Sequence, residues 1–552
     1  MNLKVFFAAV FFSVALGANA QLTTVDQLKS HVGYLADDKL EGRATGSEGE
    51  KLASDYISGK FYSLGLLPAG DNGTYLEAFD AFGGKELGDS NFLIVNKRYD
   101  PNGTWAYPHP MSSNGFTEGK IINVNYGITA TGLGYDDYNG INATNKIALI
   151  RFSSPDGNSS QSKYLDYLDE RSKIKNAAEH GAIGVIFYTT DSTYELPTSE
   201  YKKNISSETI PVWVVDSSIA RILTTYSKKI EMAVELNPII RTGHNVLGFI
   251  DNGAAETVVI GAHYDHLGHG EIDGSLYRGK PAIHNGADDN ASGVSLIIEL
   301  ARKLKNSDLK NNNYLVVAFS GEEMGLFGSK ALMNSTIINK YHINYMLNYD
   351  MVGRLDTART VIINGVGTSA DWNVIHSVTA GNLKLQTTES GIGPSDQTSF
   401  YLKDIPVLHF FTGSHADYHK PSDDFYKINF QGIESILNYS YALIDSLNDN
   451  GKINFTKTKD DTSDKAPKFS VTMGVVPDYA YSGKGMRIDG VSDGKPAQKA
   501  GLLAGDIVLK LGDFEIVDMM SYMQALGKFK KGESTTVTIL RNNSEMQIPV
   551  QF

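Results

Sequence analysis

Acidic and histidine side chains stand directly after three apolar runs in the middle of the chain. TVVIGA is followed by His263, Asp265 and His266, LVVAFSG by Glu322 and Glu323, and NYMLNY by Asp350. Continuous apolar runs are typical of parallel strands buried on both faces. In open α/β sheets, ligands bind beyond the carboxyl ends of such strands. The sequence therefore predicts that three strands deliver imidazole and carboxylate groups to one crevice.

Two loop segments carry further groups of the same kind. GADDNASG supplies Asp288 and Asp289 just before a predicted helix, and YHKPSDD supplies His419. Aspartate is also a preferred helix N-cap, and one of the two aspartates is assigned that role. A lone histidine is more often structural, but the accompanying acids favour a functional role for this one. Because the chain has no cysteine, any metal must be held by His, Asp and Glu.

The elements that must position these groups have a strand, loop, helix pattern, repeated over residues 239–450. GVSLIIELARKLK places Val294, Ile297, Ile298 and Ala301 on one helical face. This pattern predicts an α/β domain with a mostly parallel sheet flanked by helices. Residues 21–114 open with helical spacing and are assigned to the N-terminal part of the same domain.

The remaining segments predict accessory domains. Residues 115–238 alternate short β-rich runs (IALIRF, GVIFYT, IPVWVV) with turns and carry few paired acids or histidines. Residues 451–467 are polar and charged, which predicts a linker. Residues 468–552 are rich in β-type residues and form a predicted C-terminal domain.

The first residues predict export. MNLKVFFAAVFFSVALGANA has one lysine, an apolar run and a small-x-small ending, so residues 1–20 form a predicted signal peptide. We therefore expect a periplasmic or extracellular location. No later segment is apolar for about 20 residues, so no stable membrane insertion is expected. The net charge of −13 argues against nucleic acid as a partner.

Five motifs, taken in order, resemble the ligand motifs of the dinuclear zinc aminopeptidase family: GAHYDH, GADDNASG, FSGEEMGL, NYDMVG and YHKPSDD. That metallopeptidase family also contains glutamate-carboxypeptidase-like members. The opening LADDKLEGRATGSEGE is similar to the family's N-terminal segment. Residues 115–238 resemble a protease-associated domain through DYNG and NAAEHGAIGVIF, and residues 468–552 resemble a PDZ domain through GKPAQKAGLLAGDIVLKLG.

The resemblance implies a zinc exopeptidase fold with two Zn²⁺ ions per chain, for which cobalt or manganese could substitute. It implies five metal ligands: His263 and Asp350 on one ion, Glu323 and His419 on the other, and Asp289 on both. It also implies that Glu322 is the general base acting on a water held between the ions, and that Asp265 orients His263 by accepting its other ring proton.

The predicted activity is the release of N-terminal residues from peptides by a zinc-dependent aminopeptidase. A carboxypeptidase of the same family is the first alternative; it would need an arginine cluster, for which Arg278 and Arg354 are available. A one-zinc glutaminyl-cyclase-like relative is disfavoured by the complete ligand set. A catalytically dead peptide-binding scaffold is disfavoured for the same reason.

Two further expectations concern recognition of peptides. The PDZ-like domain is expected to bind a peptide or a protein C-terminus. Gln397, in SDQTSF, stands where many relatives carry a histidine. Because Gln397 is not among the implied ligands, we expect this departure to affect substrate contacts rather than metal binding.

Overall fold

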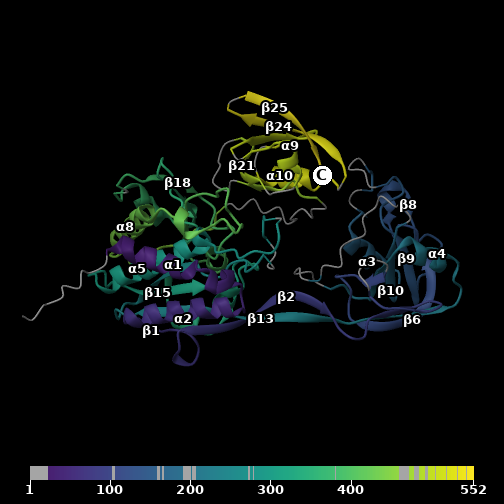
Figure 1. The fold of residues 1–552 in the computed structure, drawn as a ribbon, viewed down its shortest axis with the longest axis horizontal. Helices are drawn as coiled ribbons and strands as arrows, with labels where there is room; N and C mark the ends of the chain where they lie inside the picture. The colour runs from purple at the N-terminus through teal and green to yellow at the C-terminus, as the bar shows by residue number, and fades with distance from the viewer. Residues whose placement is uncertain are drawn as a thin grey trace, which may run out of the picture.

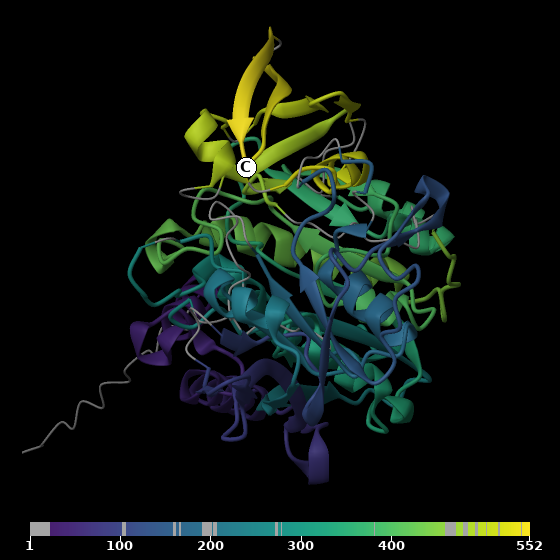
Figure 2. The same ribbon diagram turned by 90° about the vertical axis from the view of Figure 1, so that its right-hand side faces the viewer.

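The computed structural model describes residues 23–552 apart from 102–105, 158–161, 165–166, 190–200, 202–206, 271–273, 278, 380, 459–470, 478–483, 492–494, 504, 517–518, 531 and 543. The predicted signal peptide and most of the predicted linker lie outside the described residues. Three large sheets, of nine, eight and six strands, organise a central domain, an insert and a C-terminal domain. Figure 1 shows the central domain at the left, the insert at the right and the C-terminal domain above. Figure 2 looks from the side of the insert and again shows the C-terminal domain at the top.

The nine-stranded sheet forms the central domain, with the strand order β1-β13-β15-β14-β16-β19-β17-β18 and β2 beside β13. The strands are β1 (Leu67–Pro68), β2 (Leu76–Leu87), β13 (Leu236–Ile250), β14 (Glu256–His263), β15 (Asn312–Phe319), β16 (Ile343–Tyr349), β17 (Thr360–Asn364), β18 (Lys384–Thr388) and β19 (Val407–Phe411). The three predicted strands that end in polar residues are β14, β15 and β16. They run parallel to one another and to β19.

The sheet is mixed, which corrects the prediction of a mostly parallel one. Strand β13 runs antiparallel to β15, and β17 runs antiparallel to β19. Parallel neighbours need a crossover connection. Strand β13 instead follows the insert, forms an antiparallel ribbon with β2 and then pairs antiparallel with β15. The α/β class itself is confirmed, because helices cover both faces of this sheet.

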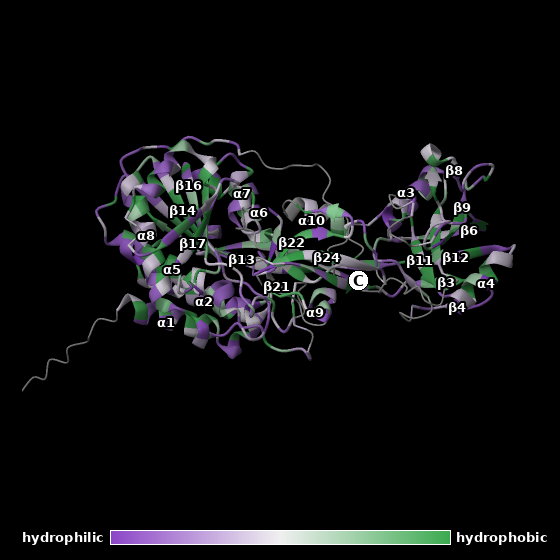
Figure 3. Cartoon of the chain, turned by 90° about the horizontal axis from the view of Figure 1, so that it is seen from above, coloured by the Kyte–Doolittle hydropathy of each residue, from purple (hydrophilic) through white to green (hydrophobic). Residues whose placement is uncertain are grey.

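One face of the central sheet is covered by α1 (Thr24–Leu35), α2 (Glu48–Ser63), α5 (Gly293–Lys305) and α8 (Phe430–Leu447). The opposite face packs against α6 (Phe327–Asn334) and α7 (Gln397–Tyr401). The predicted apolar face of α5 is fully buried at Val294, Ile297, Ile298 and Ala301. Figure 3 shows the same segregation, with hydrophobic strands inside and hydrophilic residues on the outer helices.

The insert has its own eight-stranded sheet, ordered β4-β3-β12-β6-β9-β10-β11-β5. Its strands are β3 (Phe92–Ile94), β4 (Arg98–Tyr99), β5 (Ala106–Pro108), β6 (Gly115–Asn123), β9 (Lys146–Arg151), β10 (Gly184–Tyr188), β11 (Val212–Val215) and β12 (Lys229–Val234), with helices α3 (Glu170–Glu179) and α4 (Ser217–Thr225). The sheet therefore starts at Phe92, before the predicted boundary at residue 115. Turn residues are dense between about 100 and 115 and favoured that boundary, but β3 and β4, before them, and β5, among them, all belong to this sheet.

A long two-stranded ribbon joins the insert to the central domain (Figure 1). Strands β2 and β13 pair antiparallel from Leu87 and Leu236, at the insert, to Leu76 and Val246, at the central sheet. The chain therefore leaves the central domain along one strand and returns along its neighbour.

The C-terminal domain has a hydrophobic core of its own, drawn from residues 471–552. Its elements are β20 (Val475–Pro477), β21 (Met486–Val491), α9 (Pro496–Ala500), β22 (Ile507–Leu511), β23 (Phe514–Glu515), α10 (Met519–Leu526), β24 (Ser534–Arg541) and β25 (Ser544–Gln551). The segment before it remains attached to the central domain, because Thr458 exchanges hydrogen bonds with the Tyr401 hydroxyl. No helix among the described residues is both long and apolar enough to cross a membrane.

Truncation after Lys465 is expected to leave the central domain folded. The cut preserves the contact between Thr458 and Tyr401, and the C-terminal core contains no residue from the central domain. The thermal unfolding transition of the truncated protein should lie within about 3 °C of the corresponding transition of the full chain, since surface changes usually alter stability little. A large drop in that transition would show that the C-terminal domain stabilises the rest.

Candidate metal centre

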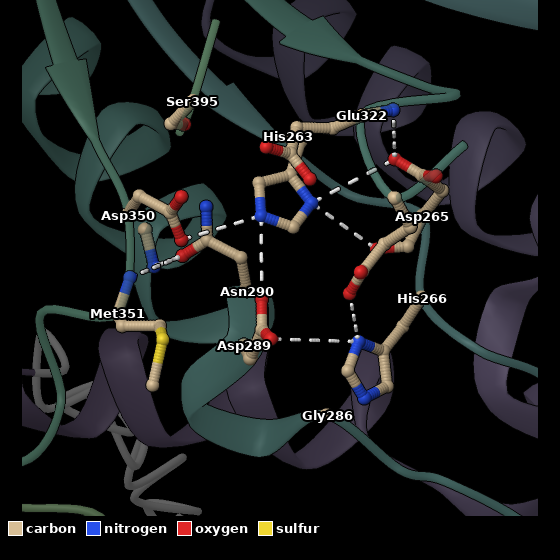
Figure 4. A network of polar contacts seen from close by, with 12 residues as sticks. His263, Asp265, His266, Gly286, Asp289, Asn290, Glu322, Asp350, Met351 and Ser395 are labelled. Atoms are coloured by element: carbon tan, nitrogen blue, oxygen red, sulfur yellow. Dashed lines mark hydrogen bonds and ion pairs between the residues drawn. The ribbon is translucent and has the colours of Figure 1, made fainter. Parts of the chain in front are cut away.

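The side chains of the predicted metal ligands meet at the carboxyl ends of the parallel strands, and Figure 4 shows His263, Asp289 and Asp350 among them. His263 ends β14, and Glu323 and Asp350 follow β15 and β16. Asp289 lies in a π-helical turn (Ala287–Ser292), and His419 comes from a loop. The Nε2 atom of His263 lies 3.3 Å from an oxygen of Asp289 and 3.2 Å from one of Asp350. The Nε2 atom of His419 lies 3.2 Å from an oxygen of Asp289 and 3.2 Å from one of Glu323.

Asp289 stands at the middle of this arrangement. Its Oδ1 faces His263, while its Oδ2 faces His419. Two groups, each with one imidazole and one further carboxylate, therefore share a single buried aspartate. Several carboxylates crowded in a buried site need cations to offset their charge, and the mixture of imidazole and carboxylate donors suits zinc. The donor chemistry of the residues present thus fits zinc.

The acidic side chains of this centre favour the protonated forms of its histidines. Burial alone would lower the pKa of His263, but Asp350 and Glu322 raise it well above its usual value. Burial likewise opposes a charge on His419, yet Glu323 and Asp289 raise its pKa well above normal. Because a metal binds the neutral imidazole, ion binding must displace these protons. Metal affinity is therefore expected to fall as the pH is lowered through the raised pKa values.

Glu322 lies beside Glu323 but in a different electrostatic environment. Burial raises the pKa of Glu322 well above its usual range; His263 opposes this, whereas Asp350 adds to it. Burial would also raise the pKa of Glu323, but His419 and other charges hold it at about 2. The environment therefore gives Glu322 a higher pKa than Glu323, which separates a proton carrier from a ligand.

Asp265 contacts His263 differently from the prediction. The Nδ1 atom of His263 is 3.2 Å from the main-chain oxygen of Asp265 and 3.7 Å from its carboxylate. That carboxylate instead accepts hydrogen bonds from the Glu322 amide, at 3.2 Å, and from the Thr45 hydroxyl, at 3.0 Å. The main-chain oxygen is therefore the nearer acceptor for the His263 ring, and the carboxylate fixes the start of the loop that carries Glu322.

The structure also distinguishes the two adjacent aspartates. Asp288 points away from the centre, accepting a hydrogen bond from the Gly353 amide and contacting His415. The carboxylate of Asp423 accepts hydrogen bonds from the main-chain amides of both Asp288 and Asp289, at 2.8 and 3.0 Å. Gly286 allows the sharp approach to this loop: its φ is +54°, and a Cβ there would lie 2.1 Å from the main-chain oxygen of Asp289.

His266 is not among the ligands that the resemblance implies, but the structure places it against the centre. Its Nδ1 lies 2.6 Å from Oε1 of Glu323, while the other oxygen of Glu323 faces His419. His266, Asp289 and Glu323 also bring ligand atoms within 4.8 Å of one another. Nε2 of His266 is buried and has no partner among the residues that the structure describes. Metal-bound histidines normally donate their other ring N–H, so this geometry favours a hydrogen bond from Nδ1–H to Glu323 over direct ligation.

Arg43 is a supporting residue that the sequence reasoning missed. Its buried guanidinium donates hydrogen bonds to the main-chain oxygens of Leu35, Tyr264, Asn285 and Gly286. These contacts tie the segment after His263 to the segment before Asp289. Burial lowers the pKa of Arg43 to about 10, while nearby carboxylates support its charge. Arg43 stands in the segment GRATGS, but a sequence does not indicate which main-chain oxygens a side chain will contact, so its role could not be predicted.

A pocket of about 270 Å³ opens beside the centre. The metal-centre residues form one wall, and the remaining lining residues are Gly325, Leu326, Met351, Asn364, Pro394, His409, Phe411, Ser414 and Tyr418. A larger pocket of about 620 Å³ lies on the C-terminal domain and contains none of the candidate ligands. The smaller pocket, next to the titratable cluster, is therefore the candidate substrate site.

Comparison with known families agrees with this combination of fold and centre. Residues 245–444 match the model of peptidase family M28, residues 117–223 that of the PA domain, and residues 453–552 that of the PDZ domain. The chain therefore combines a region that matches peptidase family M28 with a PA domain and a PDZ domain, which confirms the predicted resemblance.

Similar proteins include aminopeptidase YwaD of Bacillus subtilis, 27% identical over 330 residues, a match that covers 56% of this chain and 64% of that protein. Leucine aminopeptidase 1 of Fusarium vanettenii is 32% identical over 161 residues, covering 28% of this chain and 39% of that protein. Among solved structures, BSAP, a zinc aminopeptidase from Bacillus subtilis, aligns at 21% identity with a TM-score of 0.45, covering 80% and 97% of the two chains.

The hydrogen bond from His266 to Glu323 can be tested by paired substitutions. His266→Phe keeps a ring but removes the donor, so zinc affinity should fall about 10–100-fold, the usual effect of losing a group that orients a ligand. His266→Asn can place an amide N–H near the former Nδ1 and should retain most of the affinity. Competition with a chelator of known affinity measures both. The matched control is His284→Phe, because His284 is buried nearby but bonds to Ser275 and Ala282.

Equal losses in His266→Phe and His266→Asn would instead indicate that the nitrogen itself binds the ion. Unchanged affinity in His266→Phe would exclude any role for His266 in holding Glu323.

Proposed function

We propose that this peptidase is an exported metallo-aminopeptidase that uses two zinc ions to release N-terminal residues from peptides. The observation that carries the proposal is the position of Asp289, whose two oxygens face two separate imidazole–carboxylate groups. The proposed ligands are His263 and Asp350 on one side and Glu323 and His419 on the other. Aminopeptidases among the similar proteins support this choice.

When bound, the two ions would polarise the scissile carbonyl and lower the pKa of the attacking water. Glu322 is the proposed general base, because its raised pKa suits a group that takes a proton and later donates it to the leaving amine. Asp265 keeps Glu322 in place through the main-chain hydrogen bond. The buried carboxylates of the centre also favour a substrate with a positive α-amino group nearby.

The carboxypeptidase alternative is less well supported. Recognition of a substrate carboxylate requires an available cation, but the described pocket lining contains neither lysine nor arginine. Arg354, one of the two candidates, is paired with Asp417 and Asp423 at 3.1 and 3.0 Å. Arg278, the other, lies outside the described residues. The scaffold alternative is disfavoured because all the proposed ligands converge.

The accessory domains supply the remaining parts of the proposal. The PDZ domain is proposed to bind peptides or protein C-termini by adding a strand to a sheet edge. Export is proposed from the N-terminal sequence MNLKVFFAAVFFSVALGANA. The chain covers 64% of the YwaD protein and 39% of the Fusarium enzyme, so the substrates of those relatives do not define the substrates of this one.

Substrates with free and blocked N-termini test the proposed activity. The protein should hydrolyse amino-acid p-nitroanilides but not their N-acetyl forms. It should lose activity on chelation, recover it with zinc, and contain about two ions per chain by elemental analysis. Cleavage of N-blocked peptides from the C-terminus would support the carboxypeptidase instead. A purified protein with no zinc affinity would support the scaffold.

The two adjacent glutamates should differ when each is changed to glutamine. Glu322→Gln keeps its size but cannot take a proton, so turnover should fall by about 10²–10⁴ while zinc content is unchanged. Glu323→Gln removes an anionic ligand, so its main defect should be weaker zinc binding that excess zinc partly rescues. Elemental analysis and turnover are measured side by side, with and without added zinc. Zinc loss in Glu322→Gln with full occupancy in Glu323→Gln would reverse the two assignments.

A further inference from the structure

The pocket beside the metal centre is lined by apolar side chains on one wall and by polar side chains elsewhere. Met351 and Phe411 belong to one small hydrophobic cluster against which Tyr418 packs, and Leu326 and Pro394 add to the apolar lining. Such a wall accepts an uncharged side chain.

Two of the polar side chains in the lining come from a pair of neighbouring strands. Asn364 lies on β17 and His409 on β19, and the two residues are direct partners across the antiparallel pair. His409 is only 3% exposed, and both residues line the pocket. Buried polar groups need hydrogen-bond partners, so the partners of His409 determine which of its ring nitrogens carries the proton.

A chain of hydrogen bonds fixes the tautomer of His409. The Thr388 hydroxyl on β18 donates to Oδ1 of Asn364 at 2.6 Å. The amide oxygen of Asn364 is therefore occupied, and its NH₂ group faces Nδ1 of His409 at 3.1 Å. Because Nδ1 accepts this hydrogen bond, the ring proton resides on Nε2.

Nε2 of His409 is buried and has no hydrogen-bond partner among the described residues. Burial lowers the pKa of His409 to about 4, so the ring is neutral at physiological pH and offers one N–H donor. An unpaired buried donor is unfavourable, and a ligand that supplies an acceptor removes that cost. His409, a residue of the pocket lining, therefore carries a buried donor without an acceptor among the described residues.

We propose that His409 determines specificity by donating its Nε2–H to a neutral oxygen acceptor on the side chain of the substrate's N-terminal residue, a role that rests on the proposed aminopeptidase function. The substrate class is peptides that begin with a carboxamide residue, asparagine or glutamine. An acidic side chain is less suitable, because the pocket adjoins several carboxylates and its described lining has no lysine or arginine.

A bridging water is the competing explanation for the unpaired donor. Asn348 of β16 is paired with His409 across the parallel strands. Its Nδ2 donates to Ser395 and Gln397, while its Oδ1 is buried without a partner. A water between Oδ1 of Asn348 and Nε2 of His409 would satisfy both atoms, and substrate preference would then not depend on His409.

Asparagine and leucine p-nitroanilides provide the test, because the two side chains have nearly the same shape and differ in the acceptor. The ratio of kcat/KM for asparagine over leucine is measured for the wild type and for His409→Phe. His409→Phe keeps a ring without the donor, so the ratio should fall at least about tenfold, mainly through the asparagine substrate. His409→Gln retains a donor, so the ratio should fall less in this variant. The matched control is His284→Phe, a buried histidine outside the pocket lining, which should leave the ratio unchanged.

Thr388→Val is the second variant and leaves His409 in place. Without the hydroxyl, the Asn364 amide is free to rotate, so the ratio should fall in the same direction even if His409→Phe does not fold. An unchanged ratio in folded, zinc-loaded His409→Phe would overturn the proposal and favour the bridging water. If His409→Phe does not fold, an unchanged ratio in Thr388→Val would do the same. Failure of the wild type to cleave either anilide would instead contradict the aminopeptidase function.

Discussion

The carboxylate of Asp289 lies between two imidazoles, with Oδ1 3.3 Å from His263 and Oδ2 3.2 Å from His419. A buried aspartate surrounded by other acids is unstable unless a positive charge lies near each of its oxygens. The strands and loops of the central domain are arranged so that this condition holds on both sides. The other proposed ligands, the pocket and the supporting hydrogen bonds are all arranged around this one carboxylate.

The supporting groups act mainly on the main chain. Asp423 accepts hydrogen bonds from two successive amides, including that of Asp289. Arg43 binds main-chain oxygens on both sides of the centre. A buried arginine without a directly paired carboxylate is uncommon, but here main-chain dipoles surround it and the acidic centre supplies the opposite charge at longer range. This arrangement holds flexible loops to a precision that side-chain packing alone does not give.

The sequence was sufficient to predict which residues would meet, because apolar runs mark buried strands and the polar residues after β14, β15 and β16 must emerge at one edge of the sheet. It also predicted α5 and three strands of the insert, β9, β10 and β11. It could not predict that β13 pairs antiparallel or that the insert's sheet begins at Phe92, since pairing partners depend on contacts far apart in the chain. Nor could it assign Arg43, whose acceptors are main-chain atoms, or give His409 its tautomer, which depends on Asn364 and Thr388.

The ribbon of β2 and β13 bears on how the chain is made. During synthesis, α1, α2, β1 and β2 emerge first, but β13, which pairs with both β1 and β2, begins only at Leu236. The whole PA domain lies between them and has its own buried cores, so it can fold while the N-terminal helices still lack the sheet they cover. Folding of the insert also brings Leu87 and Leu236 side by side, which shortens the effective loop that the peptidase domain must close. A folded insert therefore lowers the entropic cost of pairing β2 with β13.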